Sequence, residues 1–301
     1  MARVVAIGEC LIELRLAGSR EAAIGYAGDT FSAAVYLNRL GHEASFATAI
    51  GADDPFSAGV LALMAEEGLD DSLVVKARGR LPGIRAVSRD AAGLPQTHDW
   101  RAEAPVRDFF RLSDEAGTGP ALLRAMREAA LVYISGETLA VIGDAGRTKL
   151  FALLAAASHA GAAVALDVNY RPRLWMAPDT ARTAMTRAAA FARYVSMSEA
   201  DGRGLGEWRP PGEAEVVERL ADRTVRVRSE DGVLDIRPGA GPHAAADATG
   251  AGDAFNAAYL AARLRGANPT GAVAAARTLA DAVAAQGGAI IPKSAMPPSA
   301  C

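Results

Sequence analysis

The sequence has few cysteines and no long hydrophobic run, and these absences exclude several classes of protein. It contains two cysteines among 301 residues, Cys10 in an apolar run and Cys301 at the end of the chain. Such thiols form neither a disulfide framework nor a metal-binding spacing, and they are typical of a reducing compartment. No segment reaches 18 uninterrupted apolar residues, and Glu9 and Glu13 interrupt the first apolar run, so neither a membrane span nor a signal peptide is predicted. We expect a soluble, cytoplasmic protein with no membrane partner.

An excess of one charge is also absent. The formal net charge is −3, and no basic stripe marks a surface for nucleic acid. No G-x-G-x-x-G motif follows the first predicted strand, which argues against a dinucleotide-binding oxidoreductase. Half of the residues are hydrophobic, enough for a large core. We expect a single domain over residues 1–301.

Short runs rich in β-branched residues alternate with longer, Ala- and Leu-rich amphipathic stretches. The predicted strands are RVVAIGECLIEL, ASFATAIG, ALVYISG, AVALDVN, YVSMS, VRVRS and VLDIR. The predicted helices are DPFSAGVLALMAEEG, residues 30–40, 139–159, 178–190 and 212–221, and two more at the end of the chain. This alternation predicts an α/β fold with a mostly parallel sheet and helices on both faces.

Two regions do not follow this alternation. Residues 15–27 and 73–101 lack helical periodicity and contain polar alternation such as LVVKARGRLPGIRAVSRD. Such alternation is typical of strands outside a buried sheet. We expect these segments to pair as a small β-sheet that forms a lid over the main sheet.

The stretch DATGAGDAF is the strongest local indication of chemistry. Gly250 and Gly252 stand where an Ala-rich helix begins, although glycine disfavours a helix by about 1 kcal/mol relative to alanine. The N–H groups and dipole of a helix N-terminus bind anions, and they should also keep the neighbouring Asp253 ionised. An anion site beside a carboxylate suits phosphoryl transfer to an alcohol, in which the carboxylate accepts the proton. The plain alternative is a glycine-containing helix cap with Thr249 as the capping residue.

A second polar group follows a predicted strand in DVNYRPRLW. Asp167, Asn169 and Arg171 lie at the carboxyl end of that strand, where open α/β sheets bind ligands. Arg171 is a candidate to hold a substrate carboxylate or a nucleotide phosphate, and Arg101 in the predicted lid is a second candidate to hold the carboxylate. The alternatives are a surface salt bridge between Asp167 and Arg171, and a solvated Arg101.

These motifs resemble the ribokinase-type (phosphofructokinase-B) family of carbohydrate kinases. DATGAGDAF is similar to the C-terminal signature of that family, and AGDTFSAAVYLNRLG is similar to its N-terminal Gly-Gly-Asp element. Within the family, IGECLIEL, SGETLAVI, DVNYRPRLW and DWR most resemble the members that phosphorylate the sugar acid 2-keto-3-deoxygluconate. The resemblance implies a ribokinase-like fold, ATP and Mg²⁺ as cofactors, and a homodimer formed through the lid.

The resemblance also implies roles for individual residues. Asp253 would be the catalytic base, with Gly250, Ala251 and Gly252 as further catalytic residues. The amides of Ala251, Gly252 and Asp253 would form the anion hole. The implied substrate-binding residues are Gly28, Asp29, Ser32, Arg85, Asp99, Arg101 and Arg171. The implied nucleotide-binding residues are Asn169, Ser198, Ser229, Gly232 and Thr249, and the implied metal-binding residue is Asp201.

The sequence departs from the family pattern in several places, among them Ala27 and Ser32, where the family has a glycine and an asparagine. The family's Asn-x-x-Glu element reads SEAD here, and its Lys-x-Gly-x-x-Gly loop reads VRSEDG. In the lid, Arg85 and Asp99 replace two tyrosines, on strands that should face each other. These two residues can pair as a salt bridge, or they can reshape the pocket for a related acid.

The leading hypothesis is ATP-dependent phosphorylation of a primary hydroxyl of a sugar acid, 2-keto-3-deoxygluconate. Arg101 and Arg171 favour an acid over a neutral sugar such as ribose or fructose, because a neutral sugar has no carboxylate to engage them. A sugar-binding regulator without turnover is the alternative from another class, since the SEAD and VRSEDG segments are altered.

Overall fold

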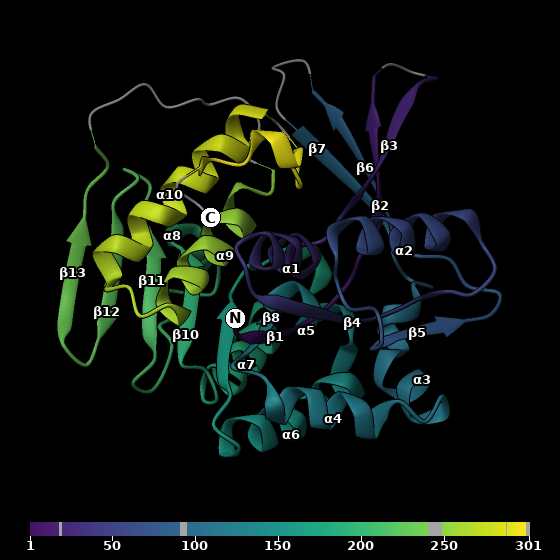
Figure 1. The fold of residues 1–301 in the computed structure, drawn as a ribbon, viewed down its shortest axis with the longest axis horizontal. Coiled ribbons are helices and arrows are strands. Elements are labelled where there is room, and N and C mark those ends of the chain that lie inside the picture. Colours follow the sequence, from purple (N-terminus) through teal and green to yellow (C-terminus); the bar gives the residue numbers. More distant parts are fainter. Residues whose placement is uncertain (18–19, 91–94, 240–248, 287, 299–301) are drawn as a thin grey trace.

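The computed structural model describes residues 1–17, 20–90, 95–239, 249–286 and 288–298. Within these residues, a large sheet has the strand order β13-β12-β11-β10-β9-β8-β1-β4-β5 (Figure 1). The neighbouring strands β11, β10, β9, β8, β1, β4 and β5 pair in parallel. At one edge, β12 and β13 add an antiparallel hairpin. The bounds are β1 (Arg3–Ile7), β4 (Glu43–Gly51), β5 (Val74–Ala77), β8 (Leu131–Ser135), β9 (Ala163–Asp167), β10 (Tyr194–Ser198), β11 (Glu215–Arg219), β12 (Val225–Ser229) and β13 (Gly232–Ile236).

Helices cover both faces of this sheet, as the alternation predicts (Figure 1). Their bounds are α1 (Asp29–Arg39), α2 (Pro55–Glu67), α3 (Phe109–Glu115), α4 (Gly119–Glu128), α5 (Gly136–Val141), α6 (Gly143–His159), α7 (Pro178–Ala189), α8 (Glu199–Gly204), α9 (Ala251–Leu264) and α10 (Pro269–Gln286), with short 3₁₀ turns at Pro105–Asp108, Pro172–Leu174 and Lys293–Ala295. None of the helices described is long and apolar enough to cross a membrane.

Strand β1 shows how the two faces are built. Val4 and Ala6 point into a core shared with α1, α2, α9 and α10, whereas Val5 and Ile7 point into a core shared with α3 to α7. Successive side chains of a strand point to opposite faces, so a central strand buried on both sides is continuously apolar. This mostly parallel α/β architecture confirms the predicted fold class.

A separate four-stranded sheet forms the lid. It consists of β2 (Leu11–Leu16), β3 (Ala22–Ala27), β6 (Ile84–Arg89) and β7 (Pro95–Trp100), in the order β3-β2-β6-β7. It projects from the edge of the main sheet in Figure 1. The predicted lid boundaries need adjustment, because the lid begins at Leu11 and because β5 joins the main sheet beside β4.

The apolar run RVVAIGECLIEL is two strands, and not one. β1 lies in the main sheet and β2 in the lid, and Gly8 to Cys10 connect them. Both strands are mostly buried, and the break between them in the sequence, Gly8 and Glu9, is too short to mark the change of sheet. Cys10 is a buried free thiol, and Cys301 lies outside the described residues.

Two helix predictions also need correction. The segment 212–221 contains β11, because Val216 and Val217 lie between β10 and β12 and the charged Glu215 and Glu218 on the same strand are buried. Their carboxylates pair with Arg263 and Arg228, so charge at these positions does not mark an exposed helix face. The helix predicted over 139–159 is interrupted between α5 and α6, where Gly143 has φ +65°.

Candidate active site

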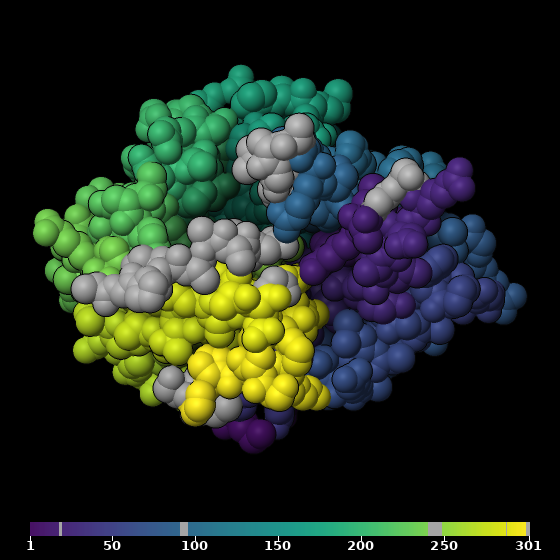
Figure 2. Space-filling model, turned by 90° about the horizontal axis from the view of Figure 1, so that it is seen from above, coloured from purple at the N-terminus to yellow at the C-terminus, as the bar shows by residue number. Residues whose placement is uncertain are grey.

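A cavity of about 660 Å³ opens at the carboxyl ends of β9, β10 and β11, beneath the lid and beside the N-termini of α1 and α9. Figure 2 looks onto this edge and shows the purple and blue lid strands near the yellow C-terminal residues. The predicted site residues that line the cavity are Gly28, Asp29, Arg85, Asp99, Asn169, Arg171, Ser198, Asp201, Thr249, Gly250, Gly252 and Asp253. The predicted residues that do not line it are Ser32, Arg101, Ser229, Gly232 and Ala251.

At the N-terminus of α9, the backbone requires glycine at position 250, whereas among the described residues position 252 has room for a side chain. Gly250, and not Thr249, is the N-cap; its φ is +77°, and a Cβ there would lie 2.5 Å from Ala289 Cα. Within the described part of the chain, a Cβ on Gly252 would meet only Arg219 Nη2, at 3.9 Å. The first turn of α9, beginning at Ala251, therefore presents its amides to the cavity beside Gly252.

Asp253 faces two other carboxylates across the cavity. Burial raises the pKa of Asp253 well above its ordinary value, and the nearby charges of Asp29 and Asp167 raise it further. This corrects the expectation that the helix dipole keeps Asp253 ionised, because desolvation and like charges outweigh a dipole effect of about 1 kcal/mol. A carboxylate of high proton affinity, once ionised, is a good acceptor for a hydroxyl proton.

Asp29 is held in place from two sides. Its Oδ1 accepts a hydrogen bond from the amide of Thr30, and its Oδ2 accepts one from Asn169 Nδ2, both at 2.6 Å. Asn169 has φ +29°, an uncommon conformation for a residue other than glycine. Gly28 is also required, since a Cβ there would lie 2.0 Å from the carbonyl oxygen of Glu9. Asn169 thus orients Asp29 in this structure.

Ser32 does not reach the cavity. It lies one turn into α1 and is completely buried, so its short side chain cannot contact a substrate there. Its sequence position in the GDTFS stretch indicated the correct helix, but only the first residues of that helix meet the cavity.

Arg101 is a buried structural cation, which corrects its prediction as a substrate clamp. Its Nε and Nη2 donate to Glu9 Oε2, and its Nη1 donates to Glu137 Oε1 at 2.6 Å. Its side chain is 5% exposed. Burial alone would raise the pKa of Glu137, but Arg101, Arg85 and Arg171 together lower it to about 2. This pairing ties the end of β7 to the main domain.

We expect Arg101→Met to destabilise the protein, because it leaves Glu9 and Glu137 buried without their main partner. Breaking a buried ion pair costs about 3–5 kcal/mol. Urea unfolding should show this loss, whereas Arg171→Met, at a side chain that is 58% exposed, should leave the free energy of unfolding nearly unchanged. Equal stability of the two variants would contradict the assignment.

Arg85 and Asp99 form the salt bridge considered above. They are direct partners of the antiparallel β6–β7 pair, and Arg85 Nε donates to Asp99 Oδ1 at 2.8 Å. Arg85 Nη2 also donates to Glu137 Oε1 at 3.0 Å. Arg171, by contrast, reaches only Glu137 among the described ion pairs, at 3.8 Å. Arg171 therefore keeps donors available for a bound carboxylate, unlike Arg85 and Arg101.

Ser198 and Asp201 form a capping box at the start of α8. Ser198 Oγ accepts a hydrogen bond from the Asp201 amide, and Asp201 Oδ2 accepts from the amide and hydroxyl of Ser198. The amide of Tyr170 donates to Asp201 Oδ1 at 2.8 Å. Both carboxylate oxygens of Asp201 are thus engaged by protein donors.

Ser229 and Gly232 lie at the wrong end of the sheet for the predicted nucleotide loop. They pair across the β12–β13 hairpin. Because β12 runs antiparallel to β11, Ser229 reaches the edge where β11 begins, and it lines a separate hollow with Glu213. The turn at the cavity edge is the one between β11 and β12, residues 220–224.

Sequence reasoning missed Arg219 and Glu137 as cavity residues. Glu137 follows the carboxyl end of β8, a position that indicates a ligand site as clearly as that of Asp167 at the end of β9. Arg219 ends β11, but the helix predicted over 212–221 concealed that position. Assigning the strand correctly would have found it.

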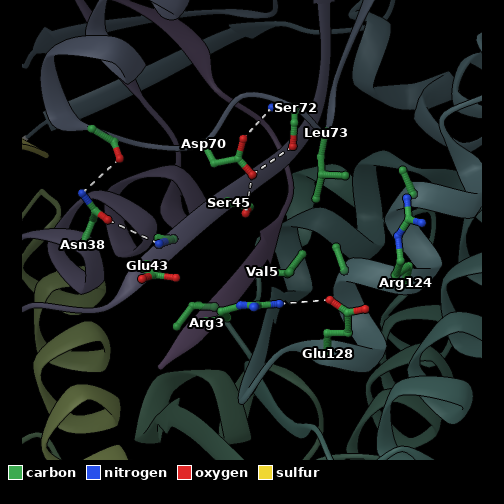
Figure 3. A pocket seen from close by; sticks show the side chains of 15 residues that line it. Arg3, Val5, Asn38, Glu43, Ser45, Asp70, Ser72, Leu73, Arg124 and Glu128 are labelled. Atoms are coloured by element: carbon green, nitrogen blue, oxygen red, sulfur yellow. Dashed lines mark hydrogen bonds and ion pairs between the residues drawn. The ribbon is translucent and has the colours of Figure 1, made fainter. Parts of the chain in front are cut away.

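A second hollow lies at the opposite edge, by the first residues of β1 and β4 (Figure 3). Its polar groups largely bond one another. Arg3 pairs with Glu128 at 3.0 Å, and Asp70 accepts hydrogen bonds from Ser45 and Ser72 (Figure 3). We therefore place the functional site at the carboxyl edge of the sheet.

The protonation of Asp167 predicts a pH dependence of stability. Burial, together with Asp29 and Asp201, outweighs Arg219 and raises the pKa of Asp167 to about 7. The folded protein holds this proton up to about pH 7, whereas the unfolded chain releases it near pH 4, so the free energy of unfolding falls between about pH 4 and about pH 7. The pKa values of Asp29 and Asp253, which are also raised, act in the same direction.

Asp167→Asn should make this decline shallower, by up to about 4 kcal/mol across the interval. Urea unfolding of the ligand-free protein from about pH 5 to about pH 8 measures it. An unchanged slope would show that Asp167 does not take up the proton.

Comparison with known proteins places this geometry in a family. Residues 1–296 match the description "pfkB family carbohydrate kinase". The chain is 31% identical to a 2-dehydro-3-deoxygluconokinase of Dickeya dadantii over 310 residues, covering 98% of each protein. It is 32% identical to the enzyme of that name from Escherichia coli K12 over 311 residues, covering 98% of this chain and 99% of that protein.

Solved structures agree on the fold. A putative ribokinase II of E. coli, in complex with ATP and Mg²⁺, has a TM-score of 0.81 at 17% identity, covering 96% of this chain and 95% of that one. The likeness thus extends over the main sheet and the lid alike. With its family match over nearly the whole chain and an aspartate beside the glycine-containing N-terminus of α9, this protein belongs to the pfkB family of carbohydrate kinases.

Proposed function

We propose that the protein transfers the γ-phosphoryl group of ATP to a primary hydroxyl of a sugar acid, 2-keto-3-deoxygluconate. The observation that carries the proposal is the Asp253 carboxylate beside the open amides of α9, in one cavity with the lid. A phosphoryl group held at that helix N-terminus would lie next to a proton acceptor.

An acid substrate is supported by Arg171. This residue lines the cavity, is 58% exposed, and has one ion-pair partner among the described residues, Glu137 at 3.8 Å. An arginine with spare donors can bind a carboxylate through two hydrogen bonds. The names of the relatives reported above point to the same sugar acid.

The cavity fits ATP with Mg²⁺, although no cluster of three or more metal-binding side chains occurs in the described residues. Mg²⁺ keeps several waters and takes one or two carboxylates together with substrate phosphates. Asp167 Oδ1 is buried and has no hydrogen-bond partner among the described residues, so it can serve as such a carboxylate. Asp201, whose oxygens are engaged, would contact the ion through water. The bound ion would supply charge neutralisation for the phosphates.

Different residues of this chain accept the proton, stabilise the transferring group and orient the acceptor. Asp253 accepts the proton of the attacking primary hydroxyl, whose oxygen forms a bond to the γ-phosphorus while the bond to the bridging oxygen breaks and ADP leaves. The amides of Ala251, Gly252 and Asp253 stabilise the charge on the transferring group. Arg171 orients the acceptor through its carboxylate, which makes the transfer effectively unimolecular.

Values of kcat/KM for 2-keto-3-deoxygluconate, its galactonate epimer, ribose and fructose test the substrate. We expect both acids to exceed both neutral sugars, and Arg171→Met to reduce this preference mainly through KM. A clear preference for ribose or fructose would overturn the acid assignment and leave the kinase standing. Sugar binding without turnover would instead favour the regulator.

A homodimer through the lid is part of the proposal. By strand alternation, Glu13, Arg85 and Asp99 share the inner face of the lid and line the cavity. The outer face carries exposed apolar residues, namely Leu16 at 45%, Ile24 at 61% and Trp100 at 63%. An exposed apolar patch of this kind suits a second copy of the chain.

Sedimentation should give a dimer that Trp100→Asp weakens; a monomeric wild type would contradict this. A cytoplasmic location also stays a prediction.

A further inference from the structure

Arg219 is held rigidly at the carboxyl end of β11. Its Nη1 donates to Ser196 Oγ and to Asn256 Oδ1, both at 2.7 Å, and its guanidinium lies over the ring of Phe255, 5.5 Å from the centroid. Ser196 belongs to the neighbouring β10, and Asn256 and Phe255 belong to α9. Three contacts from two elements therefore fix the plane of this guanidinium.

The unused side of this guanidinium faces the N-terminus of α9. A Cβ built on Gly252 would lie 3.9 Å from Nη2, and Arg219, Gly252 and Asp253 line the same cavity. Within the described residues, both hydrogen bonds of Arg219 use Nη1, so Nη2 and Nε are free to donate there. Arg219 is also the strongest charge that opposes the raised pKa of Asp167.

A fixed arginine and a helix N-terminus that converge on one space suit a phosphoryl group. The amides and dipole of α9 act from one side, and a planar cation with two spare donors acts from the other. No ion pair with a carboxylate neutralises Arg219 among the described residues, in contrast to Arg85 and Arg101.

We propose that Arg219 is a further catalytic residue, which donates through Nη2 to a non-bridging oxygen of the transferring phosphoryl group. This inference rests on the proposed kinase function. A preorganised cation beside the γ-phosphoryl group contacts it in bound ATP and more strongly as negative charge develops in the transition state, so its loss should weaken ATP binding, lower kcat, and leave the KM of the sugar acid nearly unchanged. A merely structural link between β11 and α9 would affect stability instead.

The test compares Arg219→Gln with Arg226→Gln. Arg226 lies on the adjacent β12, opposite Glu218, and pairs with Asp235 at the surface, so its variant removes the same charge outside the cavity. We expect Arg219→Gln to lower kcat about 10²–10³-fold with little change in the KM of the sugar acid, and Arg226→Gln to stay within about threefold of wild type. Arg219→Lys, which keeps the charge but not the planar fork, should fall between them.

A rescue experiment separates chemistry from folding. Added guanidinium ion should restore part of the turnover of Arg219→Ala and should leave Arg226→Gln unchanged. Folded Arg219 variants with wild-type kcat, or a loss of kcat that guanidinium does not restore and that follows a loss of stability in urea, would overturn the assignment.

The outcome also distinguishes the two proposals. If the wild type phosphorylates no sugar or sugar acid tested, the proposed function fails, and calorimetry with ATP then tests Arg219 alone. Binding of ATP weakened at least about tenfold by Arg219→Gln would still support a phosphate contact. Unchanged binding, or no binding by the wild type, would overturn it.

Discussion

Asp253→Asn is expected to lower turnover by about 10²–10⁴-fold while the affinity for the sugar acid changes little. Asparagine keeps the shape of the side chain but cannot accept the hydroxyl proton, and general-base catalysis contributes a factor of this size. Steady-state kcat and KM, with substrate binding measured separately by calorimetry, give the result. A variant that turns over like the wild type would show that another group accepts the proton.

The same substitution should not weaken the fold. Burial and the charges of Asp29 and Asp167 raise the pKa of Asp253, so its ionised form is unfavourable in the ligand-free protein. A neutral amide removes that penalty, and we expect Asp253→Asn to unfold at the same or a higher urea concentration than the wild type at about pH 8. Lost activity together with lost stability would indicate a structural role instead.

Gly252→Val should abolish phosphoryl transfer and leave the protein folded. Among the described residues, a Cβ at Gly252 meets only Arg219 Nη2, at 3.9 Å, so the valine has room beside them but occupies the space that phosphate oxygens need. Gly271→Val is a matched control, because Gly271 lies in the first turn of α10, does not line the cavity, and has no positive φ. Both variants lose a helix-terminal glycine.

We expect only Gly252→Val to lose kcat, and both variants to unfold at similar urea concentrations. Gly250→Ala should behave differently from either, since its φ of +77° and the 2.5 Å approach to Ala289 Cα make the substitution destabilising. Normal turnover of Gly252→Val would return the GAGD stretch to a plain helix cap.

The sequence predicted best what depends on local periodicity. Asp167, Asn169 and Arg171 follow an apolar strand, and strand ends meet at one edge of a parallel sheet, so their shared cavity could be expected. The glycines of α9 were found in the same way, since a helix former preceded by glycine marks a helix N-terminus. The fold class follows from the same alternation.

What failed depends on partners distant in the sequence. The pairing of Arg101 with Glu9 and Glu137 joins segments 92 and 36 residues apart, and no local pattern shows it. The raised pKa of Asp253 likewise needs Asp29 and Asp167 brought close by the fold. Arg219 was hidden by a wrong helix assignment, because a buried strand with paired glutamates has the polar spacing of an amphipathic helix.

The central claim is that this cavity joins the γ-phosphoryl group of ATP to a primary hydroxyl of a sugar acid. Incubation of the wild type with ATP, Mg²⁺ and 2-keto-3-deoxygluconate, followed by phosphorus and proton NMR of the products, tests it most directly. We predict one phosphate monoester on the terminal carbon for each ADP formed, and none with Asp253→Asn. ATP hydrolysis without an ester, or an ester at another hydroxyl, would contradict the account.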